Sequence, residues 1–480
     1  MFRLAIVKFG FAINLLAPKY VCSEDLTGYV RFDHDTTYHE MVKFKDEFRC
    51  DLLGHQYYHH NKTCIEPESA HRHLLVTNDN VHKVKLNIFN FGPDKPNMKP
   101  GDNRAKTIYV NVAADAPVVG YELDDEPVDE NNKDGEWYGT EIVSGENIIP
   151  GSATFIKSTS GAVSGSISSF EHGLVFSLST RGNQQFVEVT PHDSYPDEFE
   201  STDEDRTSKK KEWTRQSNSA KNKSRNNSRI LNRKLNSFSF TEKLNSFSFT
   251  DASNGNTVIT VMVVYTMKAM CADAGQPYPC PPSYRKTIES RIDLALTQTN
   301  EAMKYSRTKT MLRLVKKLMV DYDESSDWSN TLRKLTWKQL DQSIYTNRDR
   351  YRADVVHMVM AKGGYCGYGY IKTLKNDSFS ISNYKCATGM YSFAHEVAHN
   401  LGCDHNIENA YSNSRFARGY QDPNAKFRTV MAYSCRNGNC PRALLFSHGR
   451  RKYKSLKAGS RNENNARQIR QYSKTVAAFY

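Results

Sequence analysis

The sequence has no long apolar run beyond its N-terminus and no cysteine between residues 65 and 270. The first absence argues against transmembrane helices, each of which needs about 20 consecutive apolar residues. No nucleic-acid-binding motif accompanies the net charge of +12, so we expect no nucleic-acid partner. Ten cysteines in 480 residues are too few for a scaffold built on disulfides. Hydrophobic residues make up 38% of the chain, which is enough for a sizeable core.

Residues 1–23 predict a secretory signal peptide. Arg3 and Lys8 are basic, and the apolar stretch from Phe9 to Ala17 is too short to cross a membrane. The cysteines agree with an oxidising compartment, and so do four N-glycosylation sequons, at Asn61, Asn222, Asn226 and Asn376. We therefore expect a secreted, extracellular protein.

The stretch FAHEVAHNLGCDHN sets three histidines and one glutamate around a glycine. Residues four apart share a helical face, so a helix would point His395 and His399 at one ion, with Glu396 beside it. Gly402 can adopt the left-handed conformation that ends many helices, and the turn would return His405 to the same ion. Three protein ligands leave the fourth zinc position for water, so the motif predicts one catalytic Zn²⁺. The sequence makes no prediction about structural Ca²⁺.

This ion and the glutamate together indicate peptide-bond hydrolysis. Zinc lowers the pKa of bound water to about 7 and polarises a carbonyl group. Glu396 is the natural general base, which takes the proton of that water and delivers it to the leaving amine. We expect a zinc metalloendopeptidase that acts on proteins or peptides.

The pattern H-E-x-x-H-x-x-G-x-x-H resembles the signature of the metzincin metallopeptidases. Their second mark, a methionine turn, is matched by FRTVMAYSC with Met431. HNLG and YCGYGYIK look most like the reprolysin or adamalysin branch, in its compact form without a disintegrin region. The resemblance covers about residues 256–480 and implies an α/β domain with a mixed, mostly parallel twisted sheet, long helices and a zinc cleft. It also implies that Met431 lies beneath the zinc.

Two positions depart from the adamalysin pattern. Asn406 stands where these proteins usually carry an aspartate, which leaves the structural role of that carboxylate in question. Tyr433, two residues after Met431, resembles the tyrosine of the astacin and serralysin branches that can approach the zinc or the transition state. Tyr433 is therefore a candidate catalytic residue, and the alternative is an ordinary buried tyrosine with a bonded hydroxyl group.

YCGYGYIK precedes the expected zinc helix, and in the family this region forms the sheet edge above the cleft. An extended peptide can add to such an edge through main-chain hydrogen bonds. Gly367 and Gly369 permit close backbone approach. Together with Tyr368, they form the candidate substrate edge.

The composition divides the rest of the chain. Residues 24–200 predict a β-rich domain, which resembles the reprolysin propeptide through WYGTEIVSG and GLVFSLS. The polar, charged linker 201–255, which the acidic run PDEFESTDED introduces, cannot bury enough apolar surface to fold. Its dibasic pairs are candidate zymogen-processing sites, and the alternative is a solvated charge run: Arg233 with Lys234, and Lys210 with Lys211. KLNSFSFT occurs twice in a row there, and we have no functional account of it.

Within residues 256–480, buried strands alternate with helices, which predicts a mixed sheet with crossover helices. We expect His357, in the apolar run 353–361, to be a core or sheet-edge histidine and not a ligand. The expected strands are 257–265, 312–320 and 353–361, and the expected helices begin at Ser283 and span 330–345.

Three cysteine pairs with short spacing predict local disulfides: Cys271 with Cys280, Cys366 with Cys386, and Cys435 with Cys440. Cys403 is left over and could pair with Cys435 or Cys440, or remain a buried thiol.

Latency has three open explanations. Many relatives block the zinc with a propeptide cysteine, but none lies near the end of the expected propeptide, and Cys50 and Cys64 look like a disulfide pair. Either these cysteines act from an unusual place, or an acidic residue or steric cover keeps the zymogen inactive. We expect steric cover.

From residue 411 onward, 15 Lys or Arg stand against Asp422 and Glu463. A basic face attracts anionic ligands, so acidic glycans are a candidate partner, and the alternative is a solvated surface. The rival function is a catalytically silent secreted binding protein that uses this face. The intact histidines and glutamate argue against that rival, and the open fourth position argues against a structural zinc.

Overall fold

The computed structural model describes residues 29–33, 56–58, 63–65, 81–84, 107–111, 119–124, 135–145, 148–158, 160–196, 198, 255–410, 415–435 and 440–480. The expected signal peptide, the dibasic pairs, the KLNSFSFT duplication and the pairing of Cys50 with Cys64 lie outside these residues. The part of the chain up to Glu198 and the part from Thr257 onward belong to one compact unit.

The first part forms a nine-stranded antiparallel sheet with the order β1-β5-β6-β7-β8-β9-β10-β11-β4. A separate hairpin joins β2 (Gln56–Tyr58) to β3 (Thr63–Ile65). The strands of the sheet are β1 (Tyr29–Asp33), β4 (Val81–Val84), β5 (Thr107–Asn111), β6 (Val119–Leu123), β7 (Glu136–Ile142), β8 (Ser152–Lys157), β9 (Val163–Ser169), β10 (Leu174–Arg181) and β11 (Gln184–Pro191). One hydrophobic core, with Trp137, Phe155 and Phe176 at its centre, packs against this sheet. The predicted β-rich domain is thus present as an antiparallel sheet.

The second part is built on a five-stranded sheet with the order β13-β12-β14-β16-β15. Its neighbouring strands are parallel except for β15, which runs antiparallel to β16 at one edge. The strands are β12 (Thr257–Thr266), β13 (Thr310–Val320), β14 (Val355–Met360), β15 (Gly367–Gly369) and β16 (Phe379–Asn383). Every residue of β14 is buried, as expected for a strand covered on both faces. The predicted mixed, mostly parallel sheet is therefore confirmed.

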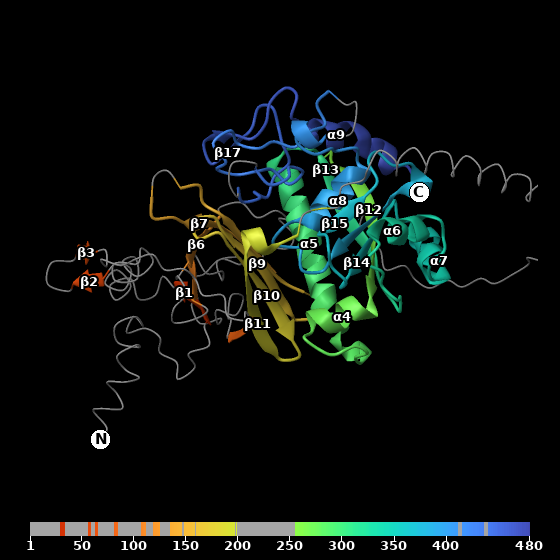
Figure 1. Ribbon diagram of the computed structural model, residues 1–480, viewed down its shortest axis with the longest axis horizontal. Coiled ribbons are helices and arrows are strands. Elements are labelled where there is room, and N and C mark those ends of the chain that lie inside the picture. Colours follow the sequence, from red (N-terminus) through yellow and green to blue (C-terminus); the bar gives the residue numbers. More distant parts are fainter. Residues whose placement is uncertain are drawn as a thin grey trace, which may run out of the picture. The chain divides into compact units, whose positions relative to one another are not determined.

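Helices pack around this sheet (Figure 1): α4 (Met267–Asp273), α5 (Arg285–Tyr305), α6 (Trp328–Thr336), α7 (Gln342–Tyr351), α8 (Ser392–Asn400) and α9 (Asn465–Val476). Apolar residues of β12, α5, α8 and α9 share one core, represented by Val263, Ile292, Val397 and Ile469. On its other side α5 contacts the antiparallel sheet, where Ser164 Oγ of β9 donates to Ser290 Oγ at 2.7 Å. The small residues of β9 leave room for this helix.

The single helix expected over residues 330–345 is wrong, because the structure forms two helices there, α6 and α7. The Asp327 side chain caps the start of α6 and that of Asp341 caps the start of α7. Lys338, between them, has a positive φ of 59° that interrupts the helical path. The turn at Lys338 and the new cap at Asp341 thus overrode a continuous helical pattern.

His357 is a core histidine, as predicted. Its Nδ1 and Nε2 atoms each lie 2.8 Å from a serine hydroxyl group of β16, on Ser380 and Ser382. Burial lowers the pKa of His357 to about 3, so the ring is neutral at ordinary pH.

The three predicted local disulfides are present: Cys271 with Cys280, Cys366 with Cys386, and Cys435 with Cys440. Cys403 remains a buried thiol, which was one of the alternatives for it. Among the described helices, none combines the length and the apolar character that crossing a bilayer requires.

Candidate metal centre

Helix α8 carries the first two histidines and the glutamate of the motif. All nine of its residues are buried, and Phe393 and Val397 pack into the main core. This packing fixes the rotation of the helix about its axis. His395 and His399 therefore lie on one face with Glu396 next to them, as their spacing predicts.

Gly402 ends the helical path and redirects the chain. Its φ is +88°, and a Cβ atom there would lie 2.5 Å from Nε2 of Gln468. Its amide donates to the carbonyl of His399 at 2.8 Å. The predicted helix-ending role of this glycine is supported by both its conformation and its tight packing, and His405 follows three residues later.

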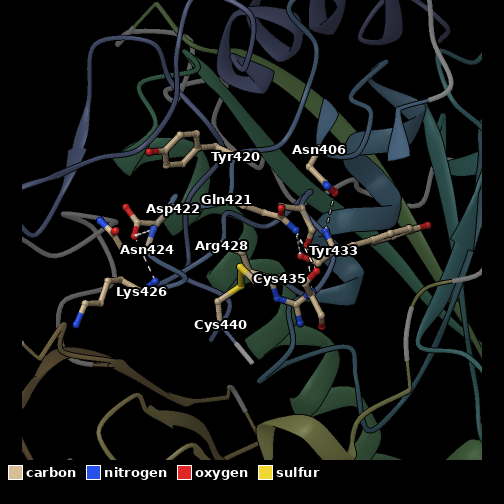
Figure 2. Close-up of a disulfide and its surroundings, with 12 residues drawn as sticks. Asn406, Tyr420, Gln421, Asp422, Asn424, Lys426, Arg428, Tyr433, Cys435 and Cys440 are labelled. Carbon is tan, nitrogen blue, oxygen red and sulfur yellow. Dashed lines mark hydrogen bonds between the residues drawn. A yellow bond between two sulfur atoms is a disulfide. The ribbon is translucent and has the colours of Figure 1, made fainter. Parts of the chain in front are cut away.

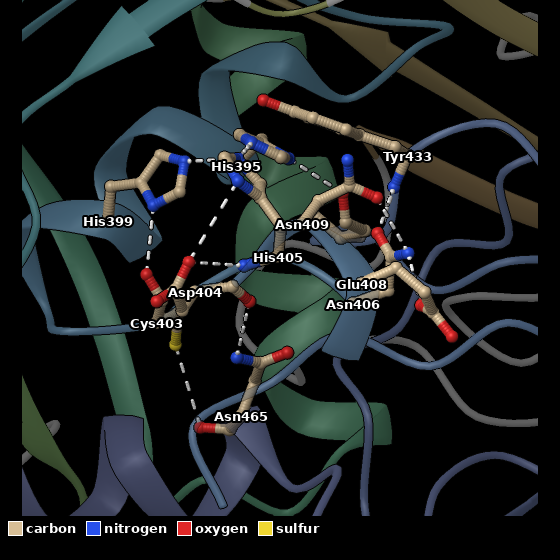
Figure 3. Close-up of polar contacts among 11 residues, drawn as sticks. His395, His399, Cys403, Asp404, His405, Asn406, Glu408, Asn409, Tyr433 and Asn465 are labelled. Atoms are coloured by element: carbon tan, nitrogen blue, oxygen red, sulfur yellow. Dashed lines mark hydrogen bonds and ion pairs between the residues drawn. The ribbon is translucent and has the colours of Figure 1, made fainter. Parts of the chain in front are cut away.

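The three imidazole rings converge through their Nε2 atoms (Figure 3). Nε2 of His405 lies 3.2 Å from that of His395 and 3.0 Å from that of His399. On the far side of the rings, Nδ1 of His395 donates to the Val430 carbonyl and Nδ1 of His399 to the Cys403 carbonyl, both at 2.8 Å. A carbonyl only accepts, so these Nδ1 atoms carry the protons and both Nε2 atoms present lone pairs.

Converging lone pairs repel one another unless a cation lies between them. Burial, together with the neighbouring His399, lowers the pKa of His395 well below its usual range, so protonation does not supply that cation. His395, His399 and His405 form a group whose ligand atoms all lie within 4.8 Å of one another. This donor set fits a divalent metal, and three imidazoles are a common set for zinc.

The methionine turn lies directly behind the histidines. Val430 holds His395 through its carbonyl, and the next residue, Met431, is buried in the same core as α8. The ring of Tyr433 packs on that of His405 at a centroid distance of 4.1 Å. Tyr433 thus lies at the metal centre, as its candidate role requires.

Asn406 connects the histidine loop to the methionine turn (Figure 2). Its Oδ1 accepts the Tyr433 amide at 3.1 Å, and its Nδ2 donates to Glu408 and Asn409. The carboxamide therefore serves as an acceptor at the position where adamalysins usually have an aspartate. Nε2 of Gln421 donates to the carbonyl of Tyr433 at 2.9 Å.

Glu396 is buried against the edge strand β15. A Cβ atom at Gly367 would lie 2.3 Å from Oε1 of Glu396, and one at Gly369 would lie 2.9 Å from Oε2. These glycines therefore make room for the glutamate inside the protein, in addition to their expected openness toward a substrate. Tyr368, between them, is buried.

Sequence reasoning missed two residues beside Glu396, namely Glu198 and Arg442. The carboxylate of Glu198 forms a compact group with His395 and Glu396, and Arg442 Nη1 donates to Glu198 Oε1 at 2.8 Å. The acidic run around Glu198 was interpreted only as the start of a linker. No local pattern connects it to Arg442, which lies 244 residues later.

Burial raises the pKa of Glu396 well above its usual range. The negative charge of Glu198 adds to this shift, and the positive charge of Arg442 opposes it. A carboxylate with a raised pKa can accept a proton near neutral pH, which is what a general base requires.

His395 and His399 on α8, which packs against the mostly parallel sheet, and His405 after the turn converge beside a buried glutamate, an arrangement typical of a metallopeptidase domain. Residues 289–406 match the family described as Metallo-peptidase family M12B Reprolysin-like. Over these residues the chain is similar to this reprolysin-like metallopeptidase family.

Two similar curated proteins are both called peptidyl-Asp metalloendopeptidase. The protein of Xanthomonas campestris is 31% identical over 235 residues, which cover 48% of this chain and 53% of the relative. The protein of Stenotrophomonas maltophilia is 30% identical over 238 residues, which cover 48% and 54%. The chain spans about half the length of the curated relatives it matches.

The contact between Gly367 and Glu396 predicts that Gly367→Ala displaces the glutamate while leaving the histidines in place. We expect an unchanged zinc content and a kcat for peptide hydrolysis reduced at least about tenfold, because small misplacements of a catalytic group cost one to two orders of magnitude. The control is Gly363→Ala, where the added methyl group meets only Asn383 Nδ2, at 3.3 Å. A raised KM with unchanged kcat would instead assign Gly367 to substrate binding.

Proposed function

We propose that the chain is a secreted zinc metalloendopeptidase made as a zymogen. The observation that carries this proposal is the convergence of three imidazole Nε2 atoms beside a buried glutamate. Zinc, when bound by His395, His399 and His405, supplies an acidified water and polarises the carbonyl of the scissile bond. Three protein ligands and a nearby base suit catalysis better than a structural ion.

Glu396 is the general base of the proposed reaction. Its raised pKa lets it take a proton from the attacking water and return it to the amine that leaves. Tyr433, whose ring packs on His405, can donate a hydrogen bond from its phenol group to the oxygen on which negative charge develops. Met431 forms an apolar floor under the metal centre.

The substrate is proposed to bind as an extended strand beside β15. This strand has β16 on one side and is the last of its sheet among the described residues, so an added peptide can continue the main-chain hydrogen bonding. The names of the curated relatives support cleavage at aspartyl residues, and we extend this preference to the chain described here.

The zymogen is proposed to follow the division of the sequence. The antiparallel sheet would act as the propeptide, because it supplies Glu198 to the metal centre and binds α5. Cleavage in the linker, at Arg233 and Lys234, would release the peptidase. The four proposed segments are a signal peptide (1–23), a propeptide (24–200), a linker (201–255) and the peptidase domain (256–480).

The role of Glu396 predicts that Glu396→Gln retains zinc and loses activity. We expect one equivalent of zinc per chain in both forms, and a kcat at least about 100-fold lower in the variant, the usual contribution of a general base. The assay uses an unfolded protein substrate after limited proteolysis of the linker, with and without a chelator. Glu289→Gln on α5 is the control. Cleavage by Glu396→Gln at the wild-type rate would contradict the assignment.

A second function, binding of polyanions, is favoured by a groove near the C-terminus. The groove has a volume of about 960 Å³, and the described residues that line it include seven arginines and lysines and no carboxylate. Burial lowers the pKa of His448, and the positive charges of Arg470, Arg451 and Arg307 add to this shift. We call this the basic groove; its cationic residues are Arg307, Lys309, Arg450, Arg451, Arg461, Arg467 and Arg470.

A sulfated glycan is the partner we propose for the basic groove, because densely spaced sulfates match densely spaced cations. Elution from immobilised heparin is expected at lower salt for the double variant Arg450→Glu, Arg461→Glu than for the wild type. The control is the double variant Lys286→Glu, Lys334→Glu, which changes the net charge equally but on helices α5 and α6, outside the basic groove. Equal elution of both double variants would show that net charge alone accounts for binding.

A further inference from the structure

The carboxylate of Glu198 is held beside the metal centre by two donors. Nη1 of Arg442 and Oγ of Ser392 each lie 2.8 Å from its Oε1. The side chains of Arg442 and Glu198 are only 3% and 2% exposed. A ligand atom of Glu198 lies within 4.8 Å of those of His395 and Glu396.

The segment that leads to Glu198 is fastened to the loop before α8. Tyr195, after β11, packs on Met390 and on the disulfide between Cys366 and Cys386. Nearby, the amide of Gly389 donates to Ser166 Oγ of β9 at 2.9 Å. These contacts deliver Glu198 to the metal centre in a defined position.

Arg442 is fixed from the side of the methionine turn. The backbone of Arg442 forms a parallel β-bridge with that of Arg428. Nη1 of Arg442 also donates to the Met390 carbonyl at 2.7 Å. The disulfide between Cys435 and Cys440 closes the loop that precedes it. The guanidinium group is therefore held in place by the peptidase domain itself.

A buried guanidinium group needs a carboxylate, because an unpaired buried charge is costly. Within the described residues the carboxylate ion-paired with Arg442 is that of Glu198. Release of the propeptide would remove this partner and leave Arg442 and Ser392 facing the metal centre. An acidic side chain of a bound substrate can then supply the missing carboxylate.

We propose that Arg442 and Ser392 form a carboxylate-binding subsite of the peptidase, which Glu198 occupies in the intact chain and an acidic substrate side chain occupies after processing. The inference rests on the proposed function. In this proposal Arg442 selects aspartyl substrates, and Glu198 competes with the substrate side chain for Arg442. Latency then depends on an acidic residue, one of the three explanations left open by the sequence, more than on steric cover.

The test of selectivity uses the processed chain and two peptides that differ only by Asp or Asn at the cleavage position. We expect wild-type kcat/KM to favour Asp at least about tenfold, because Asn leaves the buried charge of Arg442 without a carboxylate partner. Arg442→Gln should abolish this preference while retaining zinc and cleavage of the Asn peptide. Arg313→Gln, on the opposite edge strand β13, is the control.

The test of latency uses the intact, unprocessed chain. Glu198→Gln should raise its basal cleavage of the Asp peptide at least about tenfold, because an amide cannot pair with Arg442 as a carboxylate does. Glu188→Gln is the matched control. It removes a partly exposed ion pair with Lys385, which also joins the part of the chain before the linker to the part after it. If Arg442→Gln fails to fold, Ser392→Ala replaces it and should lower the Asp preference in the same direction.

The outcomes separate this inference from the proposed function. No chelator-sensitive cleavage of either peptide by the processed wild type would end the proposed function itself. If cleavage depends on Glu396 but kcat/KM is nearly equal for the Asp and Asn peptides, the proposed peptidase function stands and the proposed subsite is overturned. The subsite would also be overturned if Arg442→Gln kept the wild-type ratio of kcat/KM for the Asp and Asn peptides. The same holds if the unprocessed Glu198→Gln chain showed no increase in basal cleavage.

Discussion

Two hydrogen bonds from imidazole to backbone determine what the metal centre can do. Because Nδ1 of His395 and of His399 must donate to the carbonyls of Val430 and Cys403, their Nε2 lone pairs have to face inward. Two imidazoles held in this way, with Nε2 of His405 within 3.2 Å of both, favour a cation that accepts their lone pairs. The turn at Gly402 and the core packing of α8 maintain this arrangement.

The same centre brings negative charge to a buried position. Glu396 lies where two glycines of β15 leave space for it, and Glu198 approaches from the antiparallel sheet. Two buried carboxylates repel each other; Arg442 offsets this repulsion, and a metal ion held by the three histidines would offset it further. The electrostatics of the metal centre thus link the peptidase domain to the segment that precedes it in the chain.

This link gives one physical basis to two properties that are usually treated separately. Under the proposal, a buried arginine that pairs with Glu198 keeps the unprocessed chain inactive, and the same arginine without that partner recognises an acidic substrate. The stronger the requirement of Arg442 for a carboxylate, the better it serves both purposes. Latency of the proposed zymogen would then not require a propeptide cysteine.

The sequence by itself determined the features that depend on neighbours along the chain. The spacing of His395, Glu396 and His399 follows from the helical repeat, the short disulfides follow from proximity, and the buried strands follow from continuous apolar runs. Its prediction failed where the turn at Lys338 and the cap at Asp341 divided one expected helix into two. Only the tertiary structure decided the pairing of Arg442 with Glu198 and of His395 with Val430, because packing joins residues whose separation no local periodicity encodes.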